Sequence, residues 1–196
     1  MKKIIVIIAI ALIGFSASAQ RIGVTAGLTG PNSALKDSEI GKFSLYHVGL
    51  VANFPVMEGV RLQPELIYKV KGCAAENFGS LNDVDFSAGF IELGMEGQVG
   101  IGRDFLRAYG LIEPFLGYNL RGQGWDKEKN PIENLALSKT EYGLAVGGGV
   151  ELLQMIQASV KYFWNMGTLE AKGDAIVNGE EVRNFNGMTF SVAILF

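Results

Sequence analysis

The segment Val60–Lys71, which reads Val-Arg-Leu-Gln-Pro-Glu-Leu-Ile-Tyr-Lys-Val-Lys, has the clearest periodic pattern in the chain. Apolar side chains such as Leu66 and Tyr68 alternate here with polar ones such as Glu65 and Lys69. Because successive side chains of a β-strand point to opposite faces, a period of two predicts a strand with one apolar and one charged face. The fold prediction rests on this strand and on the segments that share its pattern.

Further segments show the same alternation, clearly in residues 141–152, 156–165 and 188–196 and more weakly in residues 22–29, 43–54, 86–101 and 106–123. Short connections at 55–59, 102–105 and 153–154 alternate with longer ones, so all the long loops leave the same end. Several strands reach the roughly 9–11 residues that a tilted strand needs to cross a bilayer. The sequence therefore predicts an all-β fold, an eight-stranded antiparallel up-and-down transmembrane β-barrel of the outer-membrane type.

The N-terminal residues have the pattern of a secretory signal peptide. A basic start at residues 1–3 precedes an almost wholly apolar run at 4–15 and a few small residues before Gln20. An apolar run of about 12 residues is shorter than the roughly 20 that a transmembrane helix needs, so we expect cleavage rather than a retained anchor. Residues 1–19 are predicted to be the signal peptide and residues 20–196 the barrel, in the cell outer membrane with both termini periplasmic.

Composition narrows the class of protein. The 196-residue chain has 48% hydrophobic residues, 19% charged residues and 26 glycines, which excludes a disordered chain and favours β-structure. Its formal net charge of −3 offers no basic surface of the kind that nucleic acids require. The single cysteine, Cys73, excludes an internal disulfide, and the single histidine, His47, excludes metal sites with two histidine ligands.

The placement of charge bears on one alternative, a soluble lipocalin-like barrel that turns its apolar face inward around a ligand. The polar faces of the predicted strands carry equal numbers of cations and anions, namely Arg61, Lys69, Lys71, Arg107, Arg121 and Lys161 against Glu65, Glu92, Glu96, Glu113, Glu141 and Glu151. We expect these groups to pair inside a closed lumen. This favours the membrane barrel and leaves the lipocalin-like alternative open.

The direction of each strand places these charges at two heights. Near the rim with the short turns we expect Arg61, Glu96, Arg107 and Glu151, and near mid-height Glu65, Lys69, Glu92, Glu113 and Lys161. The aromatic residues Tyr109, Phe115 and Phe163 are expected to share the lumen with them. Because the interior of an eight-stranded barrel is only wide enough for side chains, the sequence predicts no open pore.

Two other features concern the barrel wall. Pro64 and Pro114 lie inside predicted strands, where proline cannot donate to the hydrogen-bond ladder, so we expect a bulge or a local break at each. Aromatic residues near the strand ends are suited to interfacial girdles, namely Tyr46, Phe54, Tyr118, Tyr142 and Trp164.

Several of these segments carry a family resemblance. They are His47-Val48-Gly49-Leu50, the run from Leu62 to Tyr68 that closes on Lys71-Gly72, Phe90-Ile91-Glu92-Leu93, the run from Gly147 to Leu152, and a last strand that ends in Phe196. From about Arg21 to Phe196 the chain resembles the PorT-like outer-membrane β-barrel family, although Gly94 stands where the family has a proline. The resemblance implies an eight-stranded outer-membrane barrel. Some members of that family are linked to protein secretion, and most have no assigned activity.

Few residues are candidates for chemistry. His47 could act as a general base near the outer rim with Ser44 as nucleophile, but no spacing singles out an orienting acid. Cys73 has no histidine nearby, and Gly147–Gly149 lacks the lysine of a phosphate-binding loop. Acidic residues that could collect a divalent cation lack the calcium-loop spacing, namely Asp83, Asp85, Glu180 and Glu181. We therefore predict no catalytic residue, cofactor or metal site.

These observations predict a small outer-membrane barrel without catalytic activity, which acts through its extracellular loops as a structural, adhesion or secretion-accessory component. The alternative is a barrel that handles a small molecule, as a narrow pore, a lipid-modifying enzyme or a soluble lipocalin-like binder. Expected partners are outer-membrane lipid, envelope or secretion proteins, and the barrel-assembly machinery, which would recognise the C-terminal strand through its alternating apolar residues and Phe196.

Overall fold

The computed structural model describes residues 21–31, 45–75, 84–103, 105–125, 139–166, 169–170, 181–182 and 186–196. The predicted signal peptide (residues 1–19) and three of the candidate residues, Ser44, Asp83 and Glu180, lie outside these ranges. Among the residues that the structure describes, no helix is long and apolar enough to span a membrane.

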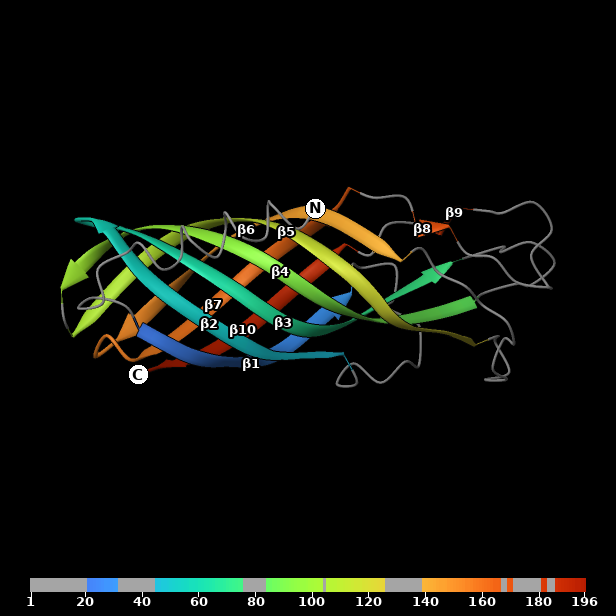
Figure 1. Cartoon of the computed structure of the whole chain (residues 1–196), viewed down its shortest axis with the longest axis horizontal. Coiled ribbons are helices and arrows are strands. Elements are labelled where there is room, and N and C mark those ends of the chain that lie inside the picture. Colours follow the sequence, from blue (N-terminus) through green and yellow to red (C-terminus); the bar gives the residue numbers. More distant parts are fainter. Residues whose placement is uncertain are drawn as a thin grey trace, which may run out of the picture.

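Eight strands form a closed barrel in which every neighbouring pair is antiparallel. They are β1 (Arg21–Pro31), β2 (Tyr46–Met57), β3 (Val60–Ala75), β4 (Val84–Arg103), β5 (Leu106–Trp125), β6 (Thr140–Leu152), β7 (Ile156–Asn165) and β10 (Gly187–Leu195) (Figure 1). Strand β1 closes the barrel because Val24 pairs with Leu50 of β2 on one side and with Ile194 of β10 on the other. The predicted eight-stranded antiparallel barrel is confirmed.

One element was not predicted from the sequence. Strands β8 (Leu169–Glu170) and β9 (Glu181–Val182) pair with each other in a separate two-stranded sheet within the long connection between β7 and β10. Each has only two residues, so neither shows an alternating pattern long enough to be recognised.

The short turns lie together at one end of the barrel, which we call the turn rim. They join Met57 to Val60, Arg103 to Leu106, and Leu152 to Ile156. The last of these turns places Leu153 and Gln154 at φ values of 52° and 57°, the left-handed region that favours glycine, asparagine or aspartate. The C-terminus lies at this end (Figure 1). We call the opposite end the loop rim.

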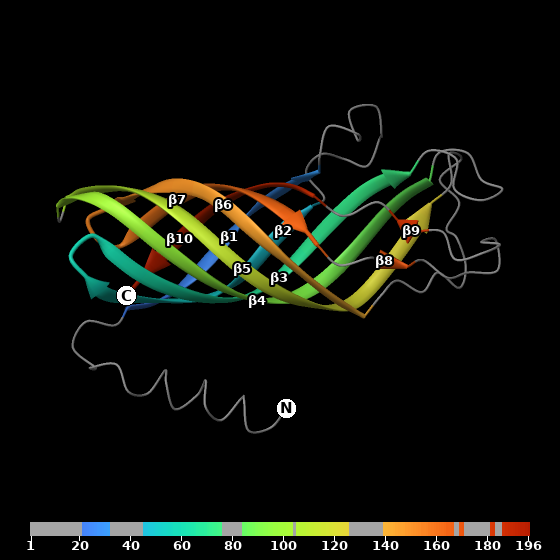
Figure 2. The same cartoon turned by 90° about the horizontal axis from the view of Figure 1, so that it is seen from above.

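Three strands extend past the others at the loop rim. Strand β3 pairs with β2 only as far as Lys69, and β5 pairs with β6 only as far as Tyr118. The ladders among β3, β4 and β5 continue beyond these points, to the Ala75–Val84 pair and to Trp125. The far ends of β3, β4 and β5 therefore form a three-stranded extension of the wall (Figure 2).

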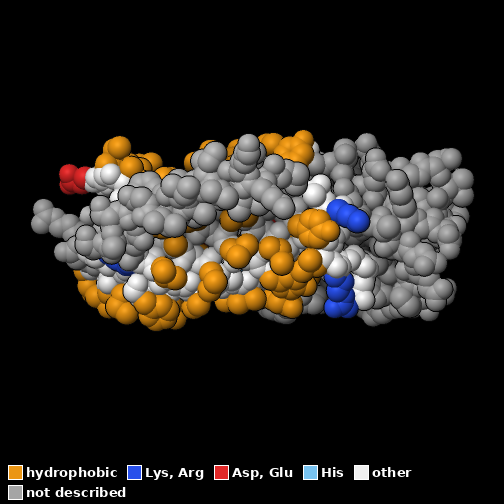
Figure 3. All heavy atoms as spheres, in the orientation of Figure 1, with side chains coloured by type: hydrophobic (Ala, Val, Ile, Leu, Met, Phe, Trp, Pro, Cys, Tyr) orange, Lys and Arg blue, Asp and Glu red, His pale blue; other side chains and the backbone are white. Residues whose placement is uncertain are grey.

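The barrel turns its apolar side chains outward and its charged side chains inward. Leu50 and Leu116 on the outer face are 56% and 64% exposed, whereas Glu92, Glu96 and Lys71 on the inner face are 1% exposed. Figure 3 shows apolar side chains over much of the described wall between the two rims. A lipocalin-like barrel would have the reverse arrangement, so this alternative is wrong.

The wall is irregular at the two prolines and at two bulges. Two residue pairs are missing from the β2–β3 ladder opposite Pro64, and two from the β4–β5 ladder opposite Pro114, although the register is unchanged across each gap. The predicted local breaks are confirmed, because proline has no amide hydrogen to donate. The register shifts instead lie at residues 55–57 of β2 and residues 89–90 of β4.

Most of the predicted girdle residues face outward near the loop rim. Tyr46, Tyr118, Tyr142 and Trp164 are exposed on the outer face. Phe54 does not belong to this set, because it is 8% exposed and lies beside the β2 register shift, where the alternation of inward and outward residues breaks. The Tyr162 ring packs against Trp164 with ring centroids 4.8 Å apart.

The outward apolar face generates a prediction about folding. We expect residues 20–196 to give a β-type circular dichroism spectrum only when detergent or lipid covers that face, and to aggregate in buffer alone. Size-exclusion chromatography and circular dichroism with and without detergent measure this. Recovery of a folded, soluble monomer without detergent would contradict the membrane assignment.

Candidate functional site

The inner surface of the barrel has two contrasting walls. Strand β1 points small side chains into the lumen, such as Thr25, Gly27 and Thr29, whereas β3 and β7 point long charged ones, such as Lys71 and Lys161. The small residues of β1 therefore leave room for the long side chains in the lumen. This arrangement explains how an eight-stranded barrel holds so many charged groups, and it makes the lumen the candidate functional site.

A four-residue cluster lies in the middle of the lumen. The ammonium nitrogen of Lys161 on β7 lies 3.0 Å from Glu65 on β3, 3.2 Å from Glu96 on β4 and 2.8 Å from Glu113 on β5. Carboxylate oxygens of these three residues lie within 4.8 Å of one another, a spacing that could hold a metal ion. Because the Lys161 ammonium lies among them, the positive charge that this cluster needs is supplied by the chain itself.

A second cluster fills the lumen between this point and the loop rim. Lys71 Nζ lies 2.6 Å from Glu92 and 2.7 Å from Glu141, and Lys69 Nζ lies 3.4 Å from Glu92. Phenylalanine rings surround both ammonium groups: Lys69 Nζ is 4.2 Å from the centre of the Phe163 ring, and Lys71 Nζ also contacts the rings of Phe90 and Phe115. Ion pairs and cation–π contacts thus stabilise two lysines that would otherwise be costly to bury.

The third cluster lies at the turn rim around Glu151 of β6. Arg61 Nη1 donates to Glu151 Oε1 at 2.6 Å, and Gln157 Nε2 donates to Oε2 at 2.9 Å. Arg21 and Arg107 lie farther away, with nitrogen atoms 3.6 and 4.0 Å from the carboxylate. Three arginines from three strands therefore face one carboxylate.

A layer of neutral amides separates the middle cluster from the turn rim. Asn53 Nδ2 donates to Gln63 at 2.8 Å, and Gln98 Nε2 donates to Glu96 at 2.7 Å. Gln98 also accepts a hydrogen bond of 2.9 Å from Arg107 Nη1. The amides connect the two charged clusters through hydrogen bonds. They also separate the carboxylate-rich middle cluster from the arginine-rich cluster at the turn rim.

The structure corrects the predicted heights of the charges. Glu96 lies in the middle cluster with Lys161 rather than at the rim, and Lys69 and Glu92 lie nearer the loop rim than Lys161 does. Strand stagger sets these heights, and a period of two carries no information about stagger. The other rim residues, Arg61, Arg107 and Glu151, are placed as predicted.

One cation was assigned to the wrong face and one was missed. Arg121 is exposed rather than luminal, because the register shift at residues 89–90 adds a residue to β5 and reverses the faces beyond it. Arg21 is the cation that was missed. Its guanidinium donates to the carbonyl and side-chain oxygens of Gln154 and lies near Glu151, so it replaces Arg121 as the sixth luminal cation. No sequence pattern pairs Arg21 with Glu151, because β1 and β6 are not neighbours in the barrel.

His47 is the one candidate for chemistry that the structure places in detail. It is 2% exposed inside the lumen, and its Nε2 lies 3.0 Å from Ser191 Oγ on β10. The ring crosses β1 above Gly27, where a Cβ atom would collide with His47 and with the carbonyl oxygen of Phe190. His47 Nδ1 has no hydrogen-bond partner among the described residues. The described geometry thus gives a histidine–serine contact without an orienting acid.

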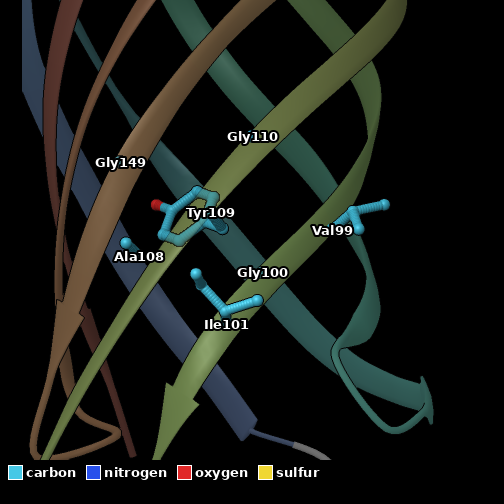
Figure 4. A pocket seen from close by; sticks show the side chains of 7 residues that line it. All are labelled: Val99, Gly100, Ile101, Ala108, Tyr109, Gly110 and Gly149. Carbon is cyan, nitrogen blue, oxygen red and sulfur yellow. The ribbon is translucent and has the colours of Figure 1, made fainter.

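The remaining candidates show no catalytic arrangement among the described residues. Gly147 lies in β6, where a Cβ atom would collide with the carbonyl oxygen of Val160, so close strand packing accounts for it. A hollow of about 290 Å³ borders β4, β5 and β6 and is lined by Val99, Gly100, Ile101, Ala108, Tyr109, Gly110 and Gly149 (Figure 4). Tyr109 is the only titratable side chain in that lining, so this hollow offers no acid–base pair.

The fold and the lumen define a class of protein, a barrel with a lipid-facing outer wall and an interior filled by charged side chains. Residues 16–169 match the family described as outer membrane protein beta-barrel domain, and the chain belongs to this family. It is therefore a small outer-membrane β-barrel. No curated protein matches the sequence.

Two solved structures of Ail, the attachment invasion locus protein of Yersinia pestis, align with this chain. Ail alone has 13% sequence identity and a TM-score of 0.39, over 91% of this chain and 97% of the Ail chain. Ail in complex with the heparin analogue sucrose octasulfate has 12% identity and the same TM-score and coverage.

The middle cluster generates a prediction about stability. We expect Lys161→Met to destabilise the folded barrel by about 3–5 kcal/mol, because removing one partner of a buried ion cluster leaves the others uncompensated. Denaturant unfolding in lipid vesicles, followed by tryptophan fluorescence, measures this. Lys139→Met, which removes an exposed lysine, is the matched control and should leave the midpoint almost unchanged.

A double variant tests whether the loss comes from the cluster itself. Lys161→Met combined with Glu113→Gln should be less destabilised than the sum of the two single variants, because the second change removes one of the stranded carboxylates. If Lys161→Met unfolds at the same denaturant concentration as Lys139→Met, the cluster does not stabilise the barrel.

The filled lumen generates a prediction about conductance. In planar bilayers we expect no stable single-channel steps, because ion pairs and phenylalanine rings occupy the lumen at the levels of Lys161 and Lys71. The matched experiment reconstitutes an open porin of known conductance under the same conditions. Reproducible, sizeable steps from this protein would show that the lumen opens in a membrane.

Proposed function

We propose that this protein is a non-catalytic outer-membrane barrel that acts through its loop rim, as a structural, adhesion or secretion-accessory component. The observation that carries the proposal is the three-stranded extension of β3, β4 and β5 beyond their neighbours. A strand needs only about 9–11 residues to span the membrane, whereas β4 and β5 each have 20. The excess length extends the hydrogen-bonded ladder of β3, β4 and β5 beyond the bilayer.

The contents of the lumen support a role without catalysis or transport. Its lysines are paired with carboxylates, and the described residues bring no nucleophile, base and orienting acid together. A narrow pore needs free cross-section, which side chains occupy here. The small-molecule alternatives therefore have no supporting observation among the described residues.

The orientation in the membrane is part of the proposal. Residues 1–19 act as a signal peptide, both termini are periplasmic, and the loop rim faces the exterior. The exposed apolar side chains of β10, such as Phe190, Val192 and Ile194, suit recognition of this strand by the barrel-assembly machinery together with Phe196. The PorT-like resemblance of the sequence supports a link to secretion among the possible roles.

The test removes the outer part of the extension and asks whether partners are lost. Replacing residues 73–86 by a two-residue Asn-Gly turn shortens the β3–β4 hairpin and keeps the luminal residues Lys71 and Glu92. We expect proteins that cross-link to the full chain in native outer membranes to be lost from the shortened variant. Affinity capture followed by mass spectrometry measures the loss.

Glu58→Gln provides the matched control, because Glu58 is exposed in the turn between β2 and β3 at the opposite rim. This variant should capture the same proteins as the full chain, and heat-modifiable electrophoretic mobility should show that all three barrels are folded in the membrane. Equal capture by the shortened variant, or capture of assembly factors alone by the full chain, would contradict a function at the loop rim.

A further inference from the structure

The arginine cluster at the turn rim has more positive than negative charge. Arg21, Arg61 and Arg107 converge on Glu151, the only carboxylate that the described ion pairs place among them. Within these described ion pairs, positive charges outnumber negative charges by two. A guanidinium remains charged in essentially every protein environment, so deprotonation cannot relieve this excess.

The compensating negative charge lies deeper in the lumen and cannot reach these arginines. Glu65, Glu96 and Glu113 outnumber Lys161 in the middle cluster, but all three lie within 3.2 Å of its ammonium group. The amide layer that includes Gln98 separates them from the rim. The described luminal charges balance one another, while the cluster around Glu151 has an excess of positive charge.

Donor groups of the cluster also remain unused among the described residues. Arg61 makes its recorded contacts through Nη1 alone, both to Glu151, which leaves Nε and Nη2 without a partner. Arg107 is held in place from two sides, because Nη1 donates to Gln98 and Nη2 donates to the Gly59 carbonyl oxygen at 3.2 Å. Arg61 thus keeps two donor nitrogens without a described partner, while Arg107 is held by two hydrogen bonds.

The exposure of these side chains increases toward the opening. The Glu151 side chain is 1% exposed, Arg107 7%, Arg61 16% and Arg21 28%. An anion that arrives from the turn rim therefore meets Arg21 and Arg61 before it approaches Glu151. The unused donors of Arg61 therefore lie in the more exposed part of the cluster, beside Arg21, whose two terminal nitrogens donate to Gln154.

We propose that Arg21 and Arg61, supported by the charge of Arg107, bind a phosphate group at the turn rim. Planar guanidinium groups match the oxygen atoms of phosphate with paired hydrogen bonds, and the excess positive charge of the cluster attracts an anionic phosphate monoester or diester. The phosphate comes either from the headgroup of an anionic lipid in the adjoining leaflet or from a soluble phosphate ester in the adjoining aqueous compartment. This site is independent of the function proposed for the loop rim.

Isothermal titration of inorganic phosphate into the folded barrel in non-ionic detergent at low salt tests the proposal. We expect saturable binding at one site, weakened about tenfold or more by Arg61→Gln and by Arg21→Gln, the effect of losing one charge-assisted hydrogen bond. Arg121→Gln, which removes an exposed arginine at the other end of the barrel, is the matched control and should bind normally. Circular dichroism and heat-modifiable mobility show that each variant is folded.

Glu151→Gln separates binding from a purely structural role. Removing this carboxylate frees Arg61 Nη1 and raises the excess charge, so phosphate should bind more tightly even if the barrel is less stable. Absence of saturable phosphate binding by the unchanged protein, equal weakening in Arg121→Gln and Arg61→Gln, or weaker binding by folded Glu151→Gln would overturn the proposal.

Nanodiscs distinguish the two sources of phosphate. If a lipid headgroup occupies the site, the affinity for inorganic phosphate should be lower in discs that contain phosphatidylglycerol than in discs of phosphatidylcholine alone, and Arg61→Gln should abolish that difference. If a soluble ester is the source, the two affinities should be equal. Each result supports recognition of phosphate by the cluster and assigns its source.

Discussion

The contact on which the rest of the structure depends is that of Lys161 with Glu65, Glu96 and Glu113 in the middle of the lumen. It joins β7 to β3, β4 and β5, none of which pairs with β7 in the barrel wall. An ammonium group and carboxylates are stable in a narrow lumen only when they face one another, because unpaired buried charge is costly. The contact therefore constrains both how far neighbouring strands are shifted along the barrel axis and how the two sides of the barrel are held together.

The clusters above and below follow from the same constraint. Toward the loop rim, Lys69 and Lys71 are matched by Glu92 and Glu141 and by phenylalanine rings. Toward the turn rim, the amide layer connects the middle cluster by hydrogen bonds to the arginines around Glu151. The outer wall needs no such pairing, because its apolar side chains meet lipid. A closed ladder satisfies the backbone at the same time, which is the condition for strands in a membrane.

Much of this fold could be predicted because the two faces of each strand meet different environments. Lipid outside and paired charges inside impose a strict period of two, and segments such as Val60–Lys71 show it directly. The prediction was wrong where the period breaks. Phe54 lies beside the β2 register shift and Arg121 lies beyond the β4–β5 shift. Pro55 and Gly89 stand at these shifts, but the same residue types also occur inside strands where the register is unchanged, such as Pro64 and Gly94, so they do not locate a shift in the sequence.

The candidate site was predicted in part. Pairing among the luminal charges followed from their equal numbers, but the partner of each charge depends on strand stagger, which placed Glu96 beside Lys161 rather than near Arg61. The excess of arginine at the turn rim was hidden for a related reason. Arg21 stands alone at the start of β1, and only the closed barrel brings it to the β6–β7 turn, beside Gln154 and Glu151.

The central claim, that lipid covers the outer face while side chains fill the inside of the barrel, is tested most directly by NMR of the folded protein in lipid nanodiscs. Adjacent residues of β10 provide an internal comparison, because Ile194 is 42% exposed on the outer wall and Leu195 is fully buried. The account predicts nuclear Overhauser contacts from lipid acyl chains to the methyl groups of Ile194 and Leu116, and none to those of Leu195 or Val51. Acyl-chain contacts to Leu195 and Val51, with none to Ile194 and Leu116, would contradict it.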